Sequence, residues 1–286
     1  MPPASHSFTG IGTTWRIDTA VPMPEGIASK IASRVRDFDL AYSRFRSDSL
    51  VAQLAASPGT VEFPPDASAL FDLYDELEEI SEGAVTPLVG RSLEHLGYDS
   101  DYSLTPSGDL HVPPRWRETV SRKGATLTTS LPVMIDVGAA GKGYLVDLVG
   151  AVLREGGIDS YVIDASGDIL NRGEPIRVAL EHPFDPSKAI GVVTLENESL
   201  CASGSNRRVW GEGLHHILDG RTGRPTDDVI ATWAVAADGL LADGLATALF
   251  FVPPARLAEH YEFDWVRLFS TGVAERSRTL RGEVFS

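Results

Sequence analysis

The chain has 286 residues, of which 43% are hydrophobic and 23% are charged, a composition that is ordinary for a soluble globular protein. Its formal net charge of −15 excludes a duplex nucleic acid as the expected partner, because neutralising a phosphate backbone needs a basic face. The single cysteine, Cys201, excludes an internal disulfide and a cysteine cluster for structural zinc.

The N-terminal stretch MPPASHSFTGIGTTWRI shows no targeting signal. It lacks a basic segment, an apolar segment and a cysteine for lipid attachment. No apolar run elsewhere approaches the roughly 18–20 residues that are needed to span a bilayer. We therefore expect a cytoplasmic protein without a membrane anchor.

A strand and two helices are predicted at the beginning of the chain. Alternating apolar residues predict a strand over 8–20, which Gly10 and Gly12 interrupt. Apolar residues at helical spacing then predict a helix over about 25–41. Serines before Leu50 suit a turn and the cap of a short helix that begins there.

The clearest helix is predicted over 66–81. Its apolar residues form one stripe, Asp66 stands in the cap position and Gly83 follows the end. This pattern indicates core scaffold. The chain that follows is rich in turn residues, and about 99–125 is predicted to be a polar insertion.

The centre of the chain is predicted to form a β-loop-α-β unit. A strand over 133–137 leads into a glycine loop and a helix over 143–155. Gly156 and Gly157 end this helix, and a strand follows over 160–164.

The C-terminal part is predicted to contain more strands than helices. Strands are expected over 176–181, 190–196, 214–218 and 229–237, then a helix over 239–251 and a final hairpin made by 263–269 and 279–285. Because helices are few and strands many, the α+β class fits better than a doubly wound sheet. No repeat or linker divides the chain, so we expect a single domain over 1–286.

The stretch IDVGAAGKGYLVD, residues 135–147, combines a glycine-rich loop with Lys142 at the start of a helix. Unpaired N–H groups and the dipole at a helix N-terminus favour an anion such as phosphate. The P-loop pattern fails because Gly143 replaces the hydroxyl residue that ligates magnesium, and the dinucleotide fingerprint fails by its spacing. A tight packing turn therefore explains the segment as well as a ligand loop does.

A second segment, GLLADGLATALFF, offers oxygen ligands for a metal ion. Asp243 and Thr247 stand four residues apart on a predicted helix, so their side chains share one face. A carboxylate and a hydroxyl are hard ligands that suit Mg²⁺. The alternative is an ordinary aspartate near a helix start beside a partly buried threonine.

A third segment, HHILDGRTGRP at 215–225, gathers titratable and charged groups on one loop. A positioned histidine can act as a base or an acid, because its ordinary pKa lies nearest neutrality. The concentration of Asp219, Arg221 and Thr222 beside two histidines favours a functional loop. A purely structural histidine is the alternative.

Seven segments, in this order along about 10–252, resemble the ApbE family of FAD:protein FMN transferases. They are GTTWRI (12–17), YSRFRSDSLVAQL (42–54), IDVGAAGKGYLVD (135–147), DASGDI (164–169), CASGS (201–205), HHILDGRTGRP (215–225) and ADGLAT (242–247). The second of them matches the family segment almost residue for residue.

The chain also departs from the family pattern. Family members usually carry Asp-Pro-Thr where this chain has Thr86-Pro87-Leu88, so nucleotide affinity or preference is expected to differ if those side chains hold FAD. Within the other motifs, Ala202 replaces a threonine and Gly220 replaces a proline.

The resemblance implies an α+β, T-fold-like structure with mixed, mainly antiparallel sheets, a few helices and an FAD site in a cleft between substructures. It implies Mg²⁺-dependent transfer of FMN from FAD to a threonine or serine hydroxyl of a target flavoprotein, with release of AMP. In such chemistry the protein contributes position and charge neutralisation more than covalent steps. Two alternatives remain, a Mg²⁺-dependent FAD pyrophosphatase and a flavin-binding protein without catalysis.

The resemblance also implies roles for single residues. The expected metal ligands are the Ala139 carbonyl, Asp243 and Thr247, with Lys142 neutralising a phosphate oxygen. The expected base for the incoming hydroxyl is His216, with Asp219 and His215 as alternatives. Contacts to the flavin nucleotide are implied for Ile11, Gly12, Thr13, Ser43, Arg44, Phe45, Lys142, Gly167, Asp168, Ser203 and Gly204. Phe45 either stacks on a ring system or belongs to the core.

Overall fold

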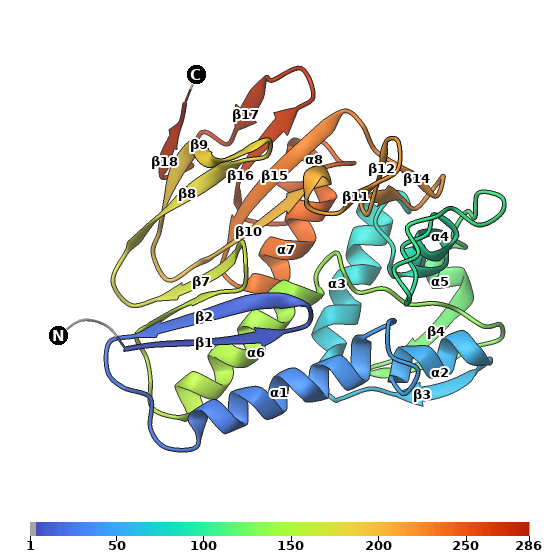
Figure 1. Cartoon of the computed structure of the whole chain (residues 1–286), viewed down its shortest axis with the longest axis horizontal. Helices are drawn as coiled ribbons and strands as arrows, with labels where there is room; N and C mark the ends of the chain where they lie inside the picture. Colours follow the sequence, from blue (N-terminus) through green and yellow to red (C-terminus); the bar gives the residue numbers. More distant parts are fainter. Residues whose placement is uncertain (1–3, 286) are drawn as a thin grey trace.

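An eight-stranded sheet runs through the computed structural model, which describes residues 4–285 (Figure 1). Its strand order is β1-β2-β6-β7-β10-β15-β16-β17, and every neighbouring pair is antiparallel. The strands are β1 (Ala4–Gly10), β2 (Thr13–Thr19), β6 (Tyr161–Asp164), β7 (Asp168–Arg172), β10 (Ser199–Gly204), β15 (Val229–Ala236), β16 (Asp264–Phe269) and β17 (Ala274–Arg276).

Four smaller antiparallel sheets accompany it. Two of them have three strands, in the orders β18-β9-β8 and β3-β5-β4, and two have two strands, β11-β12 and β13-β14. Their strands are β3 (Gly59–Glu62), β4 (Val120–Lys123), β5 (Thr126–Thr129), β8 (Ile176–His182), β9 (Asp185–Leu195), β11 (Val209–Trp210), β12 (Leu214–His215), β13 (Leu218–Asp219), β14 (Arg224–Pro225) and β18 (Gly282–Val284).

The helices group around the largest sheet. Helix α6 contacts α1, α7 and β7, while α7 contacts β10 and β15 (Figure 1). The helices are α1 (Ile27–Tyr42), α2 (Leu50–Ala56), α3 (Ala67–Ile80), α4 (Gly90–His95), α5 (Trp116–Thr119), α6 (Gly141–Glu155), α7 (Gly239–Ala248) and α8 (Pro254–Leu257), with 3₁₀ turns η1 (Pro87–Val89) and η2 (Ser205–Arg207). Among residues 4–285, no helix has the length and apolar character needed to cross a bilayer.

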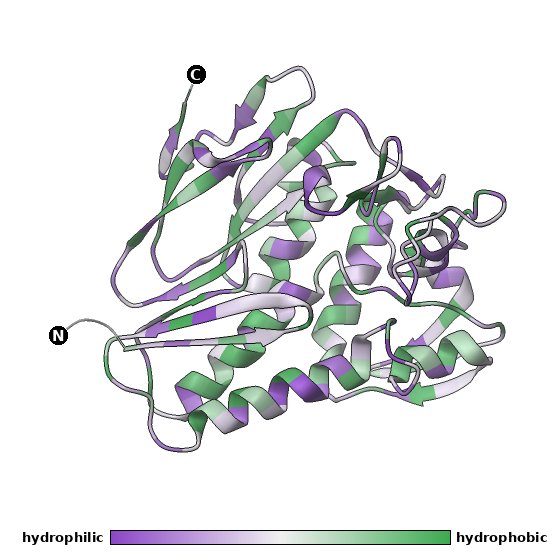
Figure 2. Cartoon of the chain, in the orientation of Figure 1, coloured by the Kyte–Doolittle hydropathy of each residue, from purple (hydrophilic) through white to green (hydrophobic). Residues whose placement is uncertain are grey.

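The interior strand β15 is buried on both faces, which explains its almost continuous apolar sequence. Ala234 and Ala236 face the main core, which contains α6 and α7. Trp233 and Val235 face a second core beneath the β18-β9-β8 sheet. Helices and a second sheet therefore cover opposite sides of the same strands, and hydrophobic residues (green in Figure 2) mark both layers.

Several helix ends follow the signals in the sequence. The Ser49 side chain caps α2 by accepting from the Ala52 N–H at 3.1 Å. Helix α6 ends at Gly156 and Gly157, the latter with φ of +77°, a left-handed conformation that glycine adopts without strain. Asp66 does precede α3, but its side chain makes no capping bond and instead pairs with Arg34 on α1.

Two predicted strands take a different form. The predicted strand 8–20 is a hairpin, because Ile11 and Gly12 adopt φ of +44° and +77° and turn the chain between β1 and β2. The predicted strand 133–137 is wrong. This segment pairs with no strand in the described structure, and its amides bond instead to isolated carbonyls, such as that of Pro87, which accepts from Asp136 at 2.8 Å.

The C-terminal pairing also differs from the prediction. Residues 214–218 form parts of β12 and β13 in two separate sheets, because the strand breaks at residues 216–217, and β12 pairs with β11 while β13 pairs with β14. The final segments do not pair with each other, since β16 pairs with β17 and β18 pairs with β9. The stretch 99–125 is not polar throughout, because Trp116 is 1% exposed in the main core.

Candidate functional site

The N-termini of α6 and α7 meet at two glycines. A Cβ atom on Gly143 would lie 2.0 Å from the Gly239 carbonyl oxygen, and one on Gly239 would lie 2.5 Å from the Gly143 oxygen. This approach lets the Gly143 N–H donate to Oδ2 of Asp243 at 2.9 Å. Glycine at position 143 therefore allows the two helices to pack closely. The Asp243 carboxylate accepts a hydrogen bond at the N-terminus of α6, where the helix dipole favours a negative charge.

The three expected metal ligands lie together at this junction. Thr247 stands one turn after Asp243 on α7, and its Oγ1 donates to the Ala139 carbonyl at 3.1 Å. Asp243 is 4% exposed. The structure thus brings a carboxylate, a hydroxyl and a backbone carbonyl from two distant parts of the sequence to one place.

Lys142 and Asp168 form the charged part of the same site. The Lys142 Nζ lies 3.3 Å from Oδ2 of Asp168 and 3.4 Å from the Ser166 carbonyl oxygen. Asp168 is fully buried, and its Oδ2 makes no hydrogen bond among the described residues. Lys142 is therefore paired with the Asp168 carboxylate in this structure, and a bound phosphate would have to share the Lys142 ammonium group with Asp168.

Burial and like charge shape the ionisation of this cluster. Burial raises the pKa of Asp243 well above its usual range, and the neighbouring Asp168 carboxylate adds to the shift. Burial also raises the pKa of Asp168, against the attraction of Lys142. Burial alone would lower the pKa of Lys142, but both carboxylates outweigh it and raise that pKa. Two buried carboxyl groups share one cation, so the site is short of positive charge.

This donor set fits a hard divalent cation. In the described part of the chain, no three His, Cys, Asp or Glu side chains gather as a metal cluster. The candidate ligands are all oxygens and include a single carboxylate, which suits Mg²⁺ because that ion keeps other positions for water and phosphate. The surplus of buried carboxyl groups supports the same fit.

Loops that carry the expected flavin contacts surround this junction. The Ser166 Oγ donates to the Thr14 carbonyl at 2.8 Å, which joins the loop before β7 to the start of β2, next to the hairpin turn. Ser166 and Gly167 have φ of +58° and +107°. Ser203, near the end of β10, places its Oγ 3.5 Å from Oγ1 of Thr247. The 165–167 loop and the β1–β2 hairpin that it contacts therefore lie on the Lys142 side of the site, and β10 lies beside Thr247 near the end of α7.

The two neighbouring histidines have different environments. His215 uses both ring nitrogens, since Nε2 lies 2.6 Å from the Thr226 carbonyl and Nδ1 accepts from the Ile217 N–H at 3.3 Å. The buried Nδ1 of His216 has no hydrogen-bond partner among the described residues. Burial, assisted by the charge of Arg208, lowers the pKa of His216 to about 3. His216 is therefore neutral, and its buried Nδ1 is not engaged by any group in the described residues.

Asp219 is held by its own loop. Arg221 donates from Nε and Nη2 to the two carboxylate oxygens, at 2.9 Å and 2.6 Å. Burial acts to raise the pKa of Asp219, but these bonds from Arg221 hold it below its usual range. Hydrogen bonds therefore occupy both ring nitrogens of His215 and both carboxylate oxygens of Asp219. Among the three candidate bases, only His216 has a side-chain atom of this kind, Nδ1, without a partner in the described residues.

One residue of the site was missing from the sequence prediction. Asp136 accepts from Arg44 Nε at 2.6 Å and from the Gly138 N–H at 2.7 Å, so it joins the 42–54 motif to the glycine turn. Phe45, next in the chain, stacks on Tyr102 with ring centroids 5.3 Å apart. Asp136 stands two residues before Gly138, and an acidic residue at the head of the glycine motif was the available signal.

Two of the departures from the family pattern touch each other. A Cβ atom on Gly220 would lie 2.4 Å from the Gly83 carbonyl and 2.5 Å from Cγ2 of Thr86. The Gly220 N–H donates to the Ala84 carbonyl at 2.8 Å, a bond that proline cannot make. The substitutions at 86 and 220 are therefore parts of one local contact.

Comparisons with known proteins agree with this arrangement. The sequence model of the ApbE family matches residues 11–265. The chain belongs to the ApbE family. A crystal structure of the ApbE protein from Thermotoga maritima superposes with a TM-score of 0.82 at 24% identity, covering 97% of both chains. The flavin transferase ApbE from Vibrio cholerae gives a TM-score of 0.78 at 21% identity, covering 100% of this chain and 98% of the other.

A sequence relative carries a functional name. A Rhodobacter capsulatus protein named FAD:protein FMN transferase is 30% identical over 294 aligned residues, which cover 93% of this chain. They cover 53% of that relative, so this chain spans about half of its length. Membership of the ApbE family and the α+β fold with mainly antiparallel sheets are thus confirmed.

Proposed function

We propose that this protein is a Mg²⁺-dependent FAD:protein FMN transferase, which moves FMN from FAD to a threonine or serine hydroxyl of a target flavoprotein and releases AMP. The observation that carries the proposal is the convergence of Ala139, Asp243 and Thr247 beside Lys142. The name of the Rhodobacter capsulatus relative supports the reaction class. The cytoplasmic location remains a prediction from the sequence.

The metal would be held by the Ala139 carbonyl, the Asp243 carboxylate and the Thr247 hydroxyl. When bound, Mg²⁺ supplies positive charge to a diphosphate and stabilises charge that develops on its oxygens. This addition suits a chain of net charge −15, whose own field disfavours an anionic substrate.

Lys142 is proposed to bind a phosphate oxygen of FAD. Its ammonium group already lies 3.3 Å from Asp168, so Asp168 fixes its position at the start of α6 while donors of the ammonium group remain for substrate. Asp168 is fully buried and cannot itself reach solvent, which assigns it to holding the lysine.

His216 is proposed to accept the proton of the incoming hydroxyl; because its Nδ1 is buried in the free protein, this role requires the 215–225 loop to expose the ring when FAD and the acceptor bind. A new bond then forms between that hydroxyl oxygen and the phosphorus of the FMN half, and the bond from this phosphorus to the bridging oxygen breaks, so that AMP leaves with its phosphate. The low pKa of His216 in the free protein keeps the ring unprotonated. We expect the bound diphosphate to raise that pKa, since a nearby anion favours the charged imidazolium.

The test uses Asp243→Ala together with a control, Asp185→Ala, which removes an exposed carboxylate on β9. Each protein is incubated with FAD, Mg²⁺ and an FMN-binding domain that carries an acceptor threonine. We expect the Asp243 variant to lose both AMP release and covalent flavin on the acceptor, whereas the control keeps them. Unchanged turnover in the Asp243 variant would remove the metal assignment.

The same incubation separates the alternatives. AMP that appears without an FMN mass increment on the acceptor would identify a Mg²⁺-dependent FAD pyrophosphatase, in which water replaces the protein hydroxyl. FAD binding without AMP would identify a flavin-binding protein that lacks catalysis. The transferase is supported only if AMP and flavinylated acceptor form in equal amounts.

A further inference from the structure

Arg44 carries a buried guanidinium group with an unusual set of neighbours. Its side chain is 3% exposed, and its Nε donates to Oδ2 of Asp136 at 2.6 Å. The guanidinium carbon lies 4.1 Å from the ring centroid of Phe45 and 4.9 Å from that of Tyr98. Two aromatic rings and one carboxylate therefore fix its plane.

Asp136 connects Arg44 to the glycine turn through a hydrogen bond. Its Oδ1 accepts from the Gly138 N–H at 2.7 Å, and its own N–H donates to the Pro87 carbonyl at 2.8 Å. A Cβ atom on Gly138 would lie 2.7 Å from the same Oδ1, so glycine is required for the carboxylate to come this close. The carboxylate thus holds the first peptide of the turn.

A carbonyl in the same turn, that of Ala139, is the one expected to bind the metal. After Gly138 comes Ala139, whose oxygen accepts from Thr247 Oγ1 at 3.1 Å. The turn closes through the Gly141 N–H, which donates to the Val137 carbonyl at 2.7 Å. The Gly138 N–H lies in the Val137–Gly138 peptide and the Ala139 carbonyl in the Ala139–Ala140 peptide, so a single peptide plane separates them, and within this closed turn the first limits the direction of the second.

We infer that Arg44 is a positioning residue, which acts through Asp136 to fix the 138–140 turn and the direction of the Ala139 carbonyl. Its Nη1 and Nη2 atoms are buried and have no hydrogen-bond partner among the described residues, so solvent and substrate do not reach them in this conformation. Removing Arg44 would leave Asp136 a carboxylate without its charge partner. The effect on the turn follows from the fold alone, and only its consequence for catalysis depends on the proposed function.

The decisive experiment measures amide hydrogen exchange in the protein without metal or FAD. In Arg44→Ala we expect the amides of residues 138–141 to exchange at least tenfold faster, while strands β8 and β9 keep their protection. Arg44→Lys should give an intermediate increase, because lysine retains the charge but lacks the planar group that fits between two rings. Arg46→Ala is the matched control, since Arg46 forms ion pairs with Asp39 and Asp48 near the surface.

Unchanged exchange of the turn in a folded Arg44→Ala protein would overturn the inference. If that variant does not fold, Asp136→Asn decides the question, because it keeps an acceptor for Gly138 but loses the charge that Arg44 binds. We expect faster exchange of the turn in that variant, and unchanged exchange would again overturn the inference.

A kinetic measurement adds the link to the proposed function. We expect Arg44→Lys to raise the KM for Mg²⁺ at least tenfold while kcat at saturating Mg²⁺ changes less than threefold, and Arg46→Ala to change neither. A kcat loss without a change in KM for Mg²⁺ would contradict the positioning role. If the wild-type protein shows no transfer at all, the proposed function fails, and the exchange experiment still tests the role of Arg44 in the fold.

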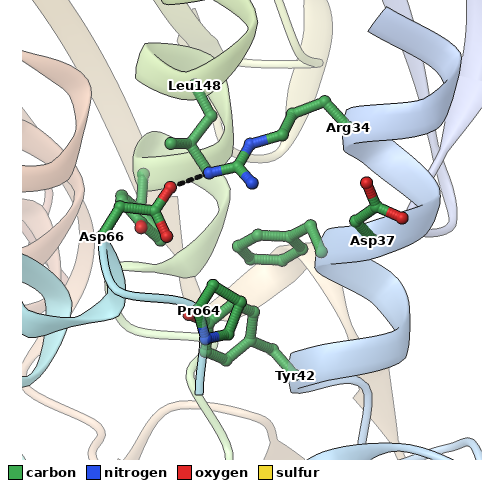
Figure 3. Close-up of a pocket in the computed structure, with 8 residues that line it drawn as sticks. Arg34, Asp37, Tyr42, Pro64, Asp66 and Leu148 are labelled. Carbon is green, nitrogen blue, oxygen red and sulfur yellow. Dashed lines mark hydrogen bonds and ion pairs between the residues drawn. The ribbon is translucent and has the colours of Figure 1, made fainter. Parts of the chain in front are cut away.

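A separate observation concerns a small cavity between α1, α6 and the segment before α3 (Figure 3). The cavity has a volume of about 10 Å³. Its walls include Arg34, Tyr42, Asp66 and Tyr144. Figure 3 shows the Arg34–Asp66 ion pair across one side of it.

Two phenol groups at this cavity lack partners. The hydroxyl oxygens of Tyr42 and Tyr144 are buried and make no hydrogen bond among the described residues. A buried hydroxyl without a partner is unfavourable, and a polar space of this size suits one water molecule with two to four partners. We propose that one ordered water molecule occupies the cavity and joins the Tyr42 hydroxyl, the Tyr144 hydroxyl and the Asp66 carboxylate.

A crystal structure that resolves ordered water, together with a double-mutant cycle, tests this second proposal. We expect a water peak within hydrogen-bond distance of both phenols. In urea unfolding, Tyr42→Phe and Tyr144→Phe should each shift the midpoint downward, and the double variant should shift it by less than their sum. An empty cavity, or shifts that are strictly additive, would overturn the proposal. Tyr261→Phe, which removes an exposed phenol bonded to Glu76, serves as the control for loss of a hydroxyl.

Discussion

At the scale of single residues, the two histidines in sequence show how environment separates identical side chains. Both ring nitrogens of His215 bond to the backbone, which fixes it as a part of the fold. His216 differs because its Nδ1 is buried without a partner. A sequence pattern cannot distinguish these cases, since both histidines stand in the same loop and next to each other.

Replacing His216 tests its role as a base. We expect His216→Asn to slow FMN transfer by about 10²–10⁴-fold, the range found for loss of a general base. FAD affinity should stay nearly unchanged, because Asn is smaller and the proposed role is proton transfer. Titration of FAD fluorescence and the rate of acceptor labelling measure the two effects. A collapse of FAD binding would instead make His216 a structural residue.

The pH dependence of transfer follows from the same environment. Burial lowers the pKa of His216 to about 3 in the free protein, so the ring stays neutral from neutral pH far into the acidic range. We therefore expect kcat/KM, which reports the free enzyme, to show no loss centred near the ordinary histidine pKa of about 6.5. A clear decrease with an apparent pKa near that value, absent in His216→Asn, would contradict the assignment.

At the scale of elements, the start of α7 depends on two acidic side chains. Asp238 accepts from the Leu241 N–H at 2.9 Å, within the helix itself. Asp147, on α6, accepts from the Gly239 and Leu240 N–H groups, each at 2.8 Å. Helix α7 is therefore capped partly by α6, and this contact helps to place Asp243 and Thr247 against the glycine turn.

Asp147 makes a specific contribution to stability against pH. Burial raises the pKa of Asp147 from 3.8 to about 6, so the folded protein binds this proton more tightly than the unfolded chain does. The protonated Asp147 therefore stabilises the fold fully below pH 3.8. This contribution is lost as the pH rises from 3.8 to about 6. Between pH 3.8 and about 6, the free energy of unfolding of the wild type should fall by on the order of 1–3 kcal/mol relative to that of Asp147→Asn. Parallel stability curves for the two proteins would contradict this expectation.

The junction between α6 and α7 gives a prediction about glycine. In Gly143→Ala, the added methyl group would meet the Gly239 carbonyl at 2.0 Å, so the helices must separate. We expect a loss of about 1–3 kcal/mol in the free energy of unfolding, as for other overpacked cores. Gly59→Ala is the control, since nothing lies within 4 Å of the added atom. Equal stability of both variants in urea unfolding would show that the junction yields without cost.

At the scale of the whole molecule, the charge opposes the proposed substrate. A net charge of −15 should slow the approach of anionic FAD, and dissolved salt screens that repulsion. Without Mg²⁺, we therefore expect the association rate of FAD to increase from low to moderate NaCl. Stopped-flow measurement of flavin fluorescence tests this. A rate that falls with added salt would show that local cations such as Lys142 dominate the field at the site.

The sequence predicted the helices better than the pairing of strands. The period of apolar residues placed α1, α3, α6 and the beginning of α7 correctly, because a helix forms from neighbours in the chain. The strand predicted over 133–137 was wrong. A buried apolar segment has the same sequence pattern as a buried strand, but here its N–H groups donate to isolated carbonyls and not to a neighbouring strand. Likewise, β18 pairs with β9 although the two are distant in the chain.

For the candidate site, the sequence determined which chemical groups were available, and the family motifs indicated which of them to combine. Only the tertiary structure decided which of them meet. It brought Ala139 to Thr247 and showed Asp136 between Arg44 and Gly138. It also used Gly143 for a contact between helices and placed the buried Asp168 carboxylate beside the Lys142 ammonium group. The physical reason is that such contacts join segments far apart in the chain, where burial and hydrogen-bond geometry, rather than local spacing, select the partners.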